Sequence, residues 1–307
     1  MILRLPLLVL KVILTSFVVW IVLSTTIPQA FVRFTEPQVQ TNHYQKSTYP
    51  YNSITSPTPL PIQNSSVYFV IGHPDDEVMF FSPSLIEITK EKNGNEVHLV
   101  CFSNGDSLHE SMGRIRGKEL VNSARILGVD ESRVTVLSSY KDGMNETWDS
   151  DKIKKSLSSI ITKGTKPAVL VTFDENGVSN HPNHISLYYG TLNYFQSTGD
   201  KSSKLFILKS LNFWEKYSFT FLTNIELFVD HLSKLVVGNI LNLDINISFF
   251  SKNSSSKSIR FYSDLNMLSV SYAAMSYGHF SQMVWFRYGW LILSRYLTFN
   301  HLIEVTR

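Results

Sequence analysis

Two short polar segments carry the residues best suited to chemistry. One is HPDDE, from His73 to Glu77, and the other is DENGVSNHPNH, from Asp174 to His184. Together they offer imidazole nitrogens and carboxylate oxygens, the donors that zinc or a similar divalent cation takes in proteins. A catalytic zinc uses three protein ligands and keeps one position for water, whose pKa falls to about 7. The remaining carboxylate and imidazole are then available to accept a proton and to stabilise an oxyanion.

A simpler interpretation treats each segment as the start of a helix. Asp75 or Asp76 would then accept hydrogen bonds from backbone N–H groups, and Glu77 would favour the first turn. However, both segments follow directly after an apolar run, VYFVI in one case and AVLVTF in the other. Two unrelated helix caps have no reason to gather His and Asp so densely at equivalent positions, and we therefore favour a metal site.

Short apolar runs alternate with amphipathic stretches from residue 67 onward. This pattern predicts four strands and three helices, the strands at 67–71, 97–102, 134–138 and 168–173 and the helices at 78–92, 110–127 and 150–162. Buried strands that alternate with helices predict an α/β fold with a Rossmann-like, mostly parallel sheet and helices on both faces. Ligands of such sheets bind at the C-terminal ends of the strands, where both polar segments fall.

The same residues resemble a known family. HPDDE after an apolar strand is similar to the LmbE-like metal-dependent deacetylases. Three later segments resemble the eukaryotic N-acetylglucosaminylphosphatidylinositol de-N-acetylases: KDGM at 141–144 with the nearby Trp148-Asp149, TFDENGVSNHPNH, and HFSQMVWFRYGW at 279–290. The similarity runs from about residue 67 to 300 and is weakest between about 196 and 270. It implies a hydrolase that removes the acetyl group from N-acetylglucosaminylphosphatidylinositol, an early step in making glycosylphosphatidylinositol anchors.

This resemblance also implies roles for individual residues. It makes His73, Asp76 and His184 the ligands of a divalent metal, with zinc as the expected ion. Asp75 is then the general base. His181 becomes the residue that stabilises the tetrahedral oxyanion or protonates the departing amine.

The resemblance points to supporting residues as well. Many members of the superfamily have Asp where this sequence has Asn183, so a carboxylate that could orient His181 or His184 is missing there, and we expect Asp174 to take that role. Four further residues match family patterns and are expected near the site: Arg116 and Glu119 in Arg-x-x-Glu, and His279 and Gln282 in His-x-Ser-Gln. A structural ion pair is the alternative for Arg116 and Glu119.

Residues 1–30 are predicted to be a membrane anchor. The stretch from Leu5 to Ile27 carries only one charge, Lys11. As a helix it would be about 34 Å long, enough to span a bilayer. A cleaved signal peptide is the alternative, but the apolar run is longer than the usual signal core of about 7 to 15 residues.

The rest of the chain divides into a tether and one catalytic domain. Residues 31–65 are rich in Pro, Ser, Thr, Asn and Gln and predict a tether, and residues 66–307 predict the LmbE-like domain. Near its end, aromatic residues are dense between Trp285 and Phe299 but are interrupted by Arg287 and Arg295, so we expect a membrane-interfacial segment rather than a spanning helix. The apolar stretch at 219–243 predicts an amphipathic helix. Core packing is the alternative for both stretches.

Composition excludes some functions and leaves others open. Twenty-eight Lys and Arg against 25 Asp and Glu give a net charge of only +3, which argues against nucleic-acid binding. The single cysteine, Cys101, excludes an internal disulfide and fits a reducing compartment. The resemblance implies the endoplasmic reticulum membrane, with a single span and the domain facing the cytoplasm. Four glycosylation sequons would matter only in the lumen: Asn64, Asn145, Asn246 and Asn253.

Two alternatives to the lipid-linked substrate remain at the level of the sequence. One is a metal-free membrane scaffold that has kept the fold of a deacetylase. The other is a deacetylase of a different N-acetylated sugar. Because every candidate ligand and base is present, we favour the enzyme, and the apolar anchor with the aromatic C-terminus favours a substrate held in the membrane.

Overall fold

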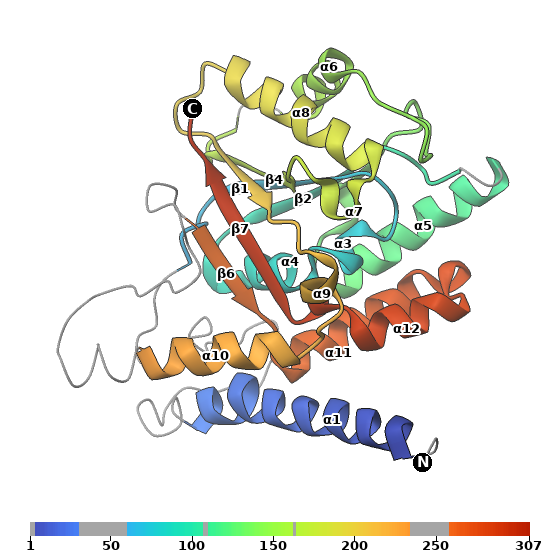
Figure 1. Ribbon diagram of the computed structural model, residues 1–307. Helices are drawn as coiled ribbons and strands as arrows, with labels where there is room; N and C mark the ends of the chain where they lie inside the picture. The colour runs from blue at the N-terminus through green and yellow to red at the C-terminus, as the bar shows by residue number, and fades with distance from the viewer. Residues whose placement is uncertain (1–3, 31–59, 107–109, 162–163, 234–257) are drawn as a thin grey trace.

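The computed structural model describes residues 4–30, 60–106, 110–161, 164–233 and 258–307. A seven-stranded sheet lies at its centre, with helices on both faces (Figure 1). The strands follow the spatial order β3-β2-β1-β4-β5-β7-β6. Their bounds are β1 Ser66–Ile71, β2 Glu96–Cys101, β3 Val134–Val136, β4 Ala168–Phe173, β5 Lys204–Leu208, β6 Ser258–Tyr262 and β7 Phe299–Val305.

Strands β1 to β5 run parallel, and β7 runs antiparallel to both of its neighbours, β5 and β6. The predicted mostly parallel sheet is therefore confirmed. Strand β1 is buried from Val67 to Ile71, which requires cover on both of its faces. Helix α8 (Pro182–Ser197) packs against β1, β4 and β5, and helix α4 (Ser82–Thr89) packs against β2, β6 and β7.

The order of the strands determines where a site can form. From β1 the chain proceeds outward in one direction through β2 and β3 and in the other through β4 and β5. Strands β1 and β4 are neighbours, with Phe69 beside Val171, so the sheet reverses its order between them. Parallel sheets bind ligands at such a switch point, beyond the carboxyl ends of the strands. Both polar segments of the sequence begin there.

The helix predicted at 78–92 is in fact interrupted. The structure has α3 (Asp76–Met79), then α4, then a 3-10 turn at Glu91–Asn93. Pro83 lies in the first turn of α4, where its missing N–H is harmless, but it cannot continue a helix from upstream. Side chains bind two carbonyl oxygens at the break. Asn300 Nδ2 donates to Phe80 O at 2.8 Å, and Ser84 Oγ donates to Phe81 O at 2.9 Å.

The other two predicted helices match the structure closely. They are α5 (Glu110–Ile126) and α6 (Ser150–Ile160), and the carboxylate of Asp149 caps α6 by accepting from Lys152 N at 2.8 Å. The remaining helical elements are η4 Glu131–Arg133, α7 Gly177–Asn180, α9 Phe213–Lys216, α10 Phe221–Ser233, α11 Leu265–Ala273, η6 Ala274–Gly278, η7 Phe280–Gln282, α12 Trp285–Leu293 and η8 Arg295–Leu297.

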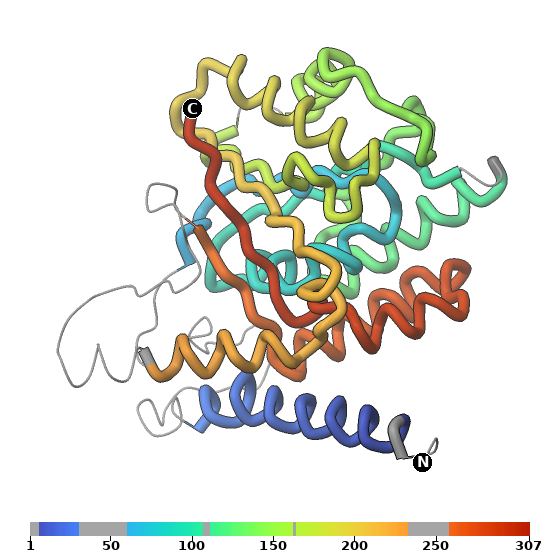
Figure 2. The backbone as a smooth tube through the Cα atoms, viewed as in Figure 1, coloured from blue at the N-terminus to red at the C-terminus, as the bar shows by residue number. Residues whose placement is uncertain are grey.

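The N-terminal helix lies against the domain. Helix α1 (Arg4–Ile21) continues through a π turn at Val22–Thr26, and Figure 2 shows it running alongside α10. Among the described residues it is the one helix long and apolar enough to cross a membrane, from Pro6 to Ala30. Most of the predicted tether lies outside the described residues. Its last part does not behave as a tether, because Leu60 and Ile62 are buried in the core.

The C-terminal aromatic segment divides into a buried half and an exposed half. Trp290 and Leu291 of α12 are buried, as are Tyr296, Leu297 and Phe299 beyond it. Core packing therefore accounts for these five residues. The exposed members of the segment are Trp285, Phe286, Tyr288, Ile292 and Leu293. Of the predicted helix at 219–243, the structure describes α10, and residues 234–243 lie outside the described part of the chain.

Candidate metal centre and catalytic cleft

Three buried side chains bring one atom each to a common point beyond β1. His184 Nε2 lies 3.2 Å from His73 Nδ1 and 3.2 Å from Asp76 Oδ2. His73 Nδ1 and Asp76 Oδ2 are 3.6 Å apart. Ligands at about 2.0 to 2.1 Å from a tetrahedral zinc ion stand about 3.3 Å from one another. The three atoms therefore have the spacing that a single metal ion requires.

In both His73 and His184, the ring nitrogen that points away from the common point is hydrogen-bonded. The other ring nitrogen faces that point and is the one placed to bind a metal. His184 Nδ1 donates to the carbonyl oxygen of Gly177 at 3.1 Å. His73 Nε2 donates to Asp142 Oδ1 at 3.1 Å and to Asn183 Oδ1 at 3.0 Å. An acceptor behind a ligating histidine fixes its tautomer and strengthens it as a ligand. Both rings are thus prepared to bind a cation.

Asp76 is kept ionised at the same point. Its Oδ2 accepts from the backbone N–H groups of Gly72 and His73, each at 2.9 Å. Burial opposes ionisation, but His184 and His73 outweigh it and hold the pKa of Asp76 well below its usual value. Burial also acts against protonated His73, yet hydrogen bonds to Asp142 and Asp76 raise the pKa of His73 to about 10. The two carboxylates thus stabilise positive charge at His73, and a divalent cation at Nδ1 would take the place of a proton there.

Gly72 allows this close packing. A Cβ atom at this position would lie 2.9 Å from His184 Cδ2 and 3.2 Å from Asp76 Oδ2. Real Cβ atoms essentially never approach another atom within 3.0 Å, and the crowded neighbours are two of the candidate ligands. The glycine before His73 is therefore part of the site.

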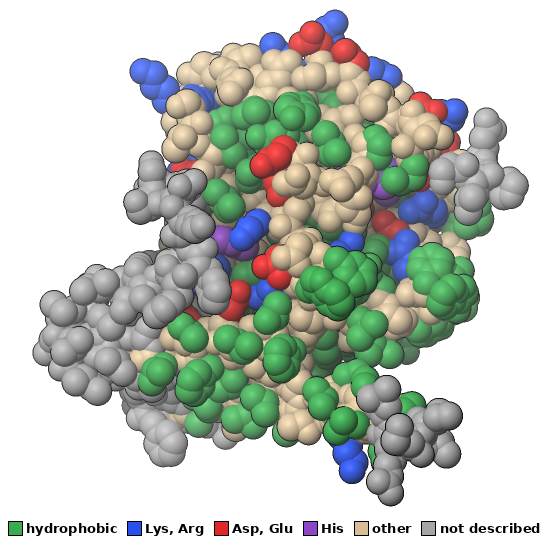
Figure 3. Space-filling view, in the orientation of Figure 1, with side chains coloured by type: hydrophobic (Ala, Val, Ile, Leu, Met, Phe, Trp, Pro, Cys, Tyr) green, Lys and Arg blue, Asp and Glu red, His purple; other side chains and the backbone are tan. Residues whose placement is uncertain are grey.

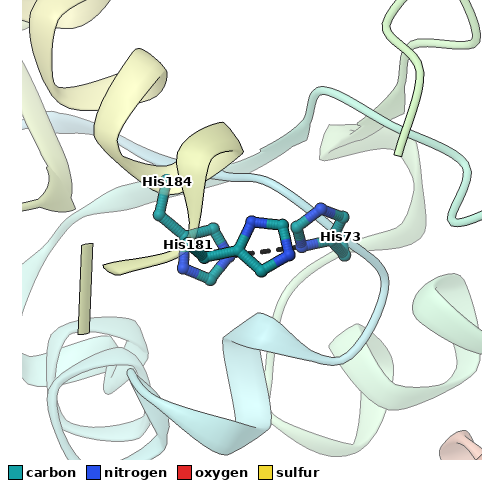
Figure 4. A group of neighbouring side chains, drawn as sticks. All are labelled: His73, His181 and His184. Carbon is teal, nitrogen blue, oxygen red and sulfur yellow. Dashed lines mark hydrogen bonds between the residues drawn. The ribbon is translucent and has the colours of Figure 1, made fainter. Parts of the chain in front are cut away.

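His181 lies beside the three ligand atoms. Its ring centroid is 4.7 Å from that of His73 and 4.8 Å from that of His184, and Figure 4 shows the three rings side by side. It caps α8, with Nδ1 accepting from Asn183 N at 3.3 Å, which leaves the proton on Nε2. Burial, together with His184 and His73, lowers the pKa of His181 to about 4, so the ring is neutral at pH 7.

These positions leave two ways to complete a metal site. One nitrogen from each of His73, His181 and His184 lies within 4.8 Å of the others, so a three-histidine site is sterically open. The set with Asp76 in place of His181 is more compact, at 3.2 to 3.6 Å, and adds a negative charge that strengthens the binding of a divalent cation. We therefore favour His73, Asp76 and His184 as ligands.

Asp75 occupies a backbone conformation that few residues other than glycine adopt. Its φ is 144°, a strain of about 1 to 3 kcal/mol that persists only where the surroundings enforce it. The buried carboxylate contacts two guanidinium groups, Arg116 Nη2 at 3.4 Å and Arg287 Nη2 more closely. The strain and the two cations hold this carboxylate at the edge of the candidate metal centre.

Hydrogen bonds around the strained turn explain how it persists. The carbonyl oxygen of Pro74 accepts from Arg116 Nη2 and from Gln282 Nε2, each at 3.0 Å. The backbone N–H of Asp75 donates to Glu77 Oε2 at 3.1 Å. The carbonyl before the strained residue and the N–H of that residue thus both have side-chain partners.

A second layer fixes those partners. Glu77 Oε1 accepts from Ser123 Oγ at 2.6 Å and from His279 Nε2 at 2.5 Å. Burial lowers the pKa of His279, but the charge of Glu77 outweighs burial and raises it. The two side chains therefore form a buried ion pair. Glu119 accepts from Ser281 N at 2.6 Å, which holds the η7 segment that carries Gln282. The expected neighbours Glu119, His279 and Gln282 therefore support the turn, whereas Arg116 also lines the cleft.

Asp174 does not have the partner that the sequence suggested. Its carboxylate accepts from Ser210 N at 2.6 Å, Ser210 Oγ at 2.5 Å and Asn176 N at 3.1 Å. The chain after β4 turns at Gly177, with φ 53°, and this turn brings the Gly177 carbonyl to His184 instead. The carboxylate that orients a ligand is Asp142, on His73. Asp174 shapes the loop and does not hold a histidine.

Two functional residues were missed by reasoning from the sequence. Asp142 lies in the KDGM segment after β3, and its place beyond the carboxyl end of a parallel strand was the available signal. Arg287 was interpreted only as an interruption of the aromatic segment. In the structure its guanidinium reaches Asp75, which is 212 residues earlier in the sequence.

A cleft of about 560 Å³ opens over these residues. At its base are His73, Asp75, Asp76, His181 and His184. Its wall is largely apolar, with a few charged residues: Met79, Phe80, Arg116, Asp142, Ser179, Lys216, Tyr217, Trp285, Phe286, Arg287, Gly289, Trp290 and Leu293. Helix α12 therefore forms one side of the cleft and α9 contributes to another.

Comparison with known proteins agrees with this geometry. The family model described as GlcNAc-PI de-N-acetylase matches residues 68–195. A Schizosaccharomyces pombe protein named probable N-acetylglucosaminyl-phosphatidylinositol de-N-acetylase is 36% identical over 78% of this chain and 87% of its own length. The Saccharomyces cerevisiae N-acetylglucosaminyl-phosphatidylinositol de-N-acetylase is 32% identical over 76% of this chain and 79% of its own length.

Solved structures are more distant. The N,N'-diacetylchitobiose deacetylase from Pyrococcus horikoshii superposes with a TM-score of 0.45 at 18% identity. That superposition covers 76% of this chain and 79% of the archaeal one.

The two ways of completing the metal site make different predictions for His181. We expect His184→Ala to lose most of the metal that the purified wild-type chain binds, because the variant lacks a ligand in either arrangement. We expect His181→Gln to keep its metal, because the proposed set uses Asp76. Metal content by elemental analysis, with thermal unfolding as the control for folding, checks both.

Retention of metal by His184→Ala would overturn the site itself. Loss of metal from a folded His181→Gln variant would instead select the three-histidine arrangement.

Proposed function

Because the chain belongs to the GlcNAc-PI de-N-acetylase family, we propose that it hydrolyses the acetamide of N-acetylglucosaminylphosphatidylinositol. The products are acetate and glucosaminylphosphatidylinositol, and the step belongs to the synthesis of glycosylphosphatidylinositol anchors. The observation that carries the proposal is the convergence of His73 Nδ1, Asp76 Oδ2 and His184 Nε2 beside Asp75 and His181.

The donor set fits a divalent metal, and we propose zinc as the ion. When bound, such a metal acts as a Lewis acid on the amide carbonyl and lowers the pKa of water at the site. His73, Asp76 and His184 would hold it. Asp142 and the Gly177 carbonyl keep the two imidazoles in the tautomer that binds.

Asp75 and His181 divide the proton transfers. The Asp75 carboxylate accepts a proton from the water that attacks the amide carbon. Neutral His181 carries its proton on Nε2, so it can donate a hydrogen bond to the developing oxyanion. The leaving nitrogen then needs one proton as the C–N bond breaks, and either residue can supply it.

The cleft suits a substrate that carries negative charge. Lys216 lies in its wall, with Nζ donating to Ser179 Oγ at 2.5 Å. Burial lowers the pKa of Lys216, and among the residues that the structure describes no carboxylate pairs with its ammonium. An anionic group would compensate this unneutralised cation. The phosphodiester of a phosphatidylinositol is such a group, which favours the lipid-linked substrate over a neutral amino sugar.

We also propose the endoplasmic reticulum membrane as the location, with the catalytic domain on the cytoplasmic side. The apolar helix from Pro6 to Ala30 supports attachment to a membrane. The single cysteine, Cys101, is buried and unpaired, which fits a reducing compartment.

Deacetylase assays of the detergent-solubilised full chain test the proposed reaction. We expect release of acetate from an N-acetylglucosaminylphosphatidylinositol analogue, loss of that activity with a chelator and its return with zinc. A glycoside of N-acetylglucosamine without phosphate should be a much poorer substrate. Equal turnover of the two compounds would support a deacetylase of other amino sugars, and no turnover of either would support a scaffold.

A second experiment separates the base from the ligands. Asp75→Asn should keep its metal but lose rate by about 10² to 10⁴, the usual contribution of a positioned general base. Single-turnover assays together with metal analysis of the same preparation check this. A variant that loses metal along with activity would mean that Asp75 is a ligand.

The proposed orientation can be tested in sealed microsomes. Added protease should digest the catalytic domain, and none of the four sequons, Asn64, Asn145, Asn246 and Asn253, should carry glycan. A protected domain that is sensitive to glycosidase would place the active site in the lumen.

A further inference from the structure

The N-terminal helix is bound to the catalytic domain along half of its length. Ser16 Oγ lies 2.8 Å from Thr220 Oγ1, and the ring of Phe17 stacks on Phe219 at 6.0 Å between centroids. Further contacts continue to the end of the helix. Asn224 Nδ2 donates to Ser16 O at 2.8 Å, His231 Nε2 donates to Leu23 O at 3.0 Å, and Leu265 N donates to Thr25 Oγ1 at 3.0 Å.

This docking limits how far the domain can stand from a membrane. The docked part runs from Ser16 to Thr25 and is about 15 Å long. Within it, the side chain of Trp20 is fully buried. Ahead of it, Pro6 to Thr15 supplies only about 15 Å more, roughly half of the 30 Å hydrocarbon core. If the helix enters the bilayer, its docked half enters as well, and it brings the helices to which it is bound to the level of the lipid.

Those neighbouring helices expose apolar side chains. On α10, four of them follow one another at helical spacing along one stripe: Phe221, Ile225, Phe228 and Leu232. On α9, Trp214 is 81% exposed beside exposed Phe213, and on α12, Trp285 is 84% exposed. Figure 3 shows green side chains gathered over the lower part of the molecule, where α9, α10 and α12 lie. Most of the blue and red side chains at the top of that view lie over α6 and α8.

The same face borders the catalytic cleft. Tyr217, Trp285, Phe286 and Leu293 are exposed on the surface and also line the cleft above the candidate metal centre. The mouth of the cleft therefore opens between α9 and α12, on the side of the domain to which α1 is bound.

We propose that the face formed by α1, α9, α10 and α12 is seated in the lipid bilayer, so that substrate enters the cleft directly from the membrane. We call this the lipid face. Because this face is continuous with the 25-residue apolar helix, we assign lipid rather than a protein as the partner that covers it. Exposed Trp and Phe at its rim are the side chains that favour the boundary between headgroups and acyl chains. The consequence for catalysis rests on the proposed lipid-linked substrate, whereas the seating itself does not.

Fluorescence quenching tests the seating without any substrate. The full chain is reconstituted in vesicles of phosphatidylcholine with and without bromine on the acyl chains, and tryptophan emission is compared between them. We expect brominated lipid to quench the wild-type emission, and Trp214→Tyr to lose part of the quenchable signal. If brominated lipid removes the same amount of emission from the two proteins, the proposal is overturned, because Trp214 would then lie in water.

Kinetics test the consequence for substrate entry. Phe213→Ser/Trp214→Ser changes two exposed side chains that lie outside the lining of the catalytic cleft. With substrate in vesicles we expect kcat/KM to fall by about tenfold or more, the order of magnitude that partial burial of two aromatic side chains contributes to binding. With a water-soluble headgroup that has no acyl chains, the rate should stay unchanged.

Tyr189→Ser is the matched control. Tyr189 is 53% exposed on α8, away from the lipid face, and its replacement should leave both rates unchanged. Equal losses on the two substrates in the α9 variant would overturn the entry route. Quenching at Trp214 without activity on any lipid substrate would instead retain the seating and refute the proposed function.

Discussion

Negative charge buried at the end of β1 is the constraint on which the site depends. Asp75, Asp76, Glu77 and Asp142 lie within one turn or one contact of His73, and a buried carboxylate without a partner costs several kcal/mol. Glu77 is neutralised by His279, and Asp75 by two arginines. What remains is Asp76 and Asp142 beside His73 and His184, with Arg116 Nη1 also 3.6 Å from Asp142 Oδ2. A divalent cation where His73 Nδ1, Asp76 Oδ2 and His184 Nε2 converge would neutralise the carboxylate of Asp76.

The partners that neutralise this charge come from segments far apart in the sequence. Arg116 is on α5, Gln282 follows the π turn after α11, and Arg287 is on α12, yet all three reach the turn between β1 and α3. The C-terminal segment is therefore an integral part of the catalytic domain, since two of the three residues that hold Pro74 and Asp75 belong to it. Its exposed aromatic side chains lie on the outside of the same short helix.

Local pattern explains what could be predicted from the sequence and what could not. The strands and both polar segments were evident because apolar runs and clustered His and Asp are local features, and the switch point brings the two segments together. The break before Pro83 could have been expected from the proline. The pairing of Asp142 with His73 and of Arg287 with Asp75 depends on how loops and α12 fold back, which no local pattern encodes.

The packing of α1 on α10 means that the N-terminal helix is not an interchangeable module. A shortened protein that lacks the first 30 residues would not simply become soluble, because Phe219, Thr220 and Asn224 would lose the partners that cover them. A foreign apolar helix fused in its place could be equally apolar, but it would lack Ser16, Phe17 and the other groups that match α10. The helix is therefore a structural part of the folded domain, whatever else it does.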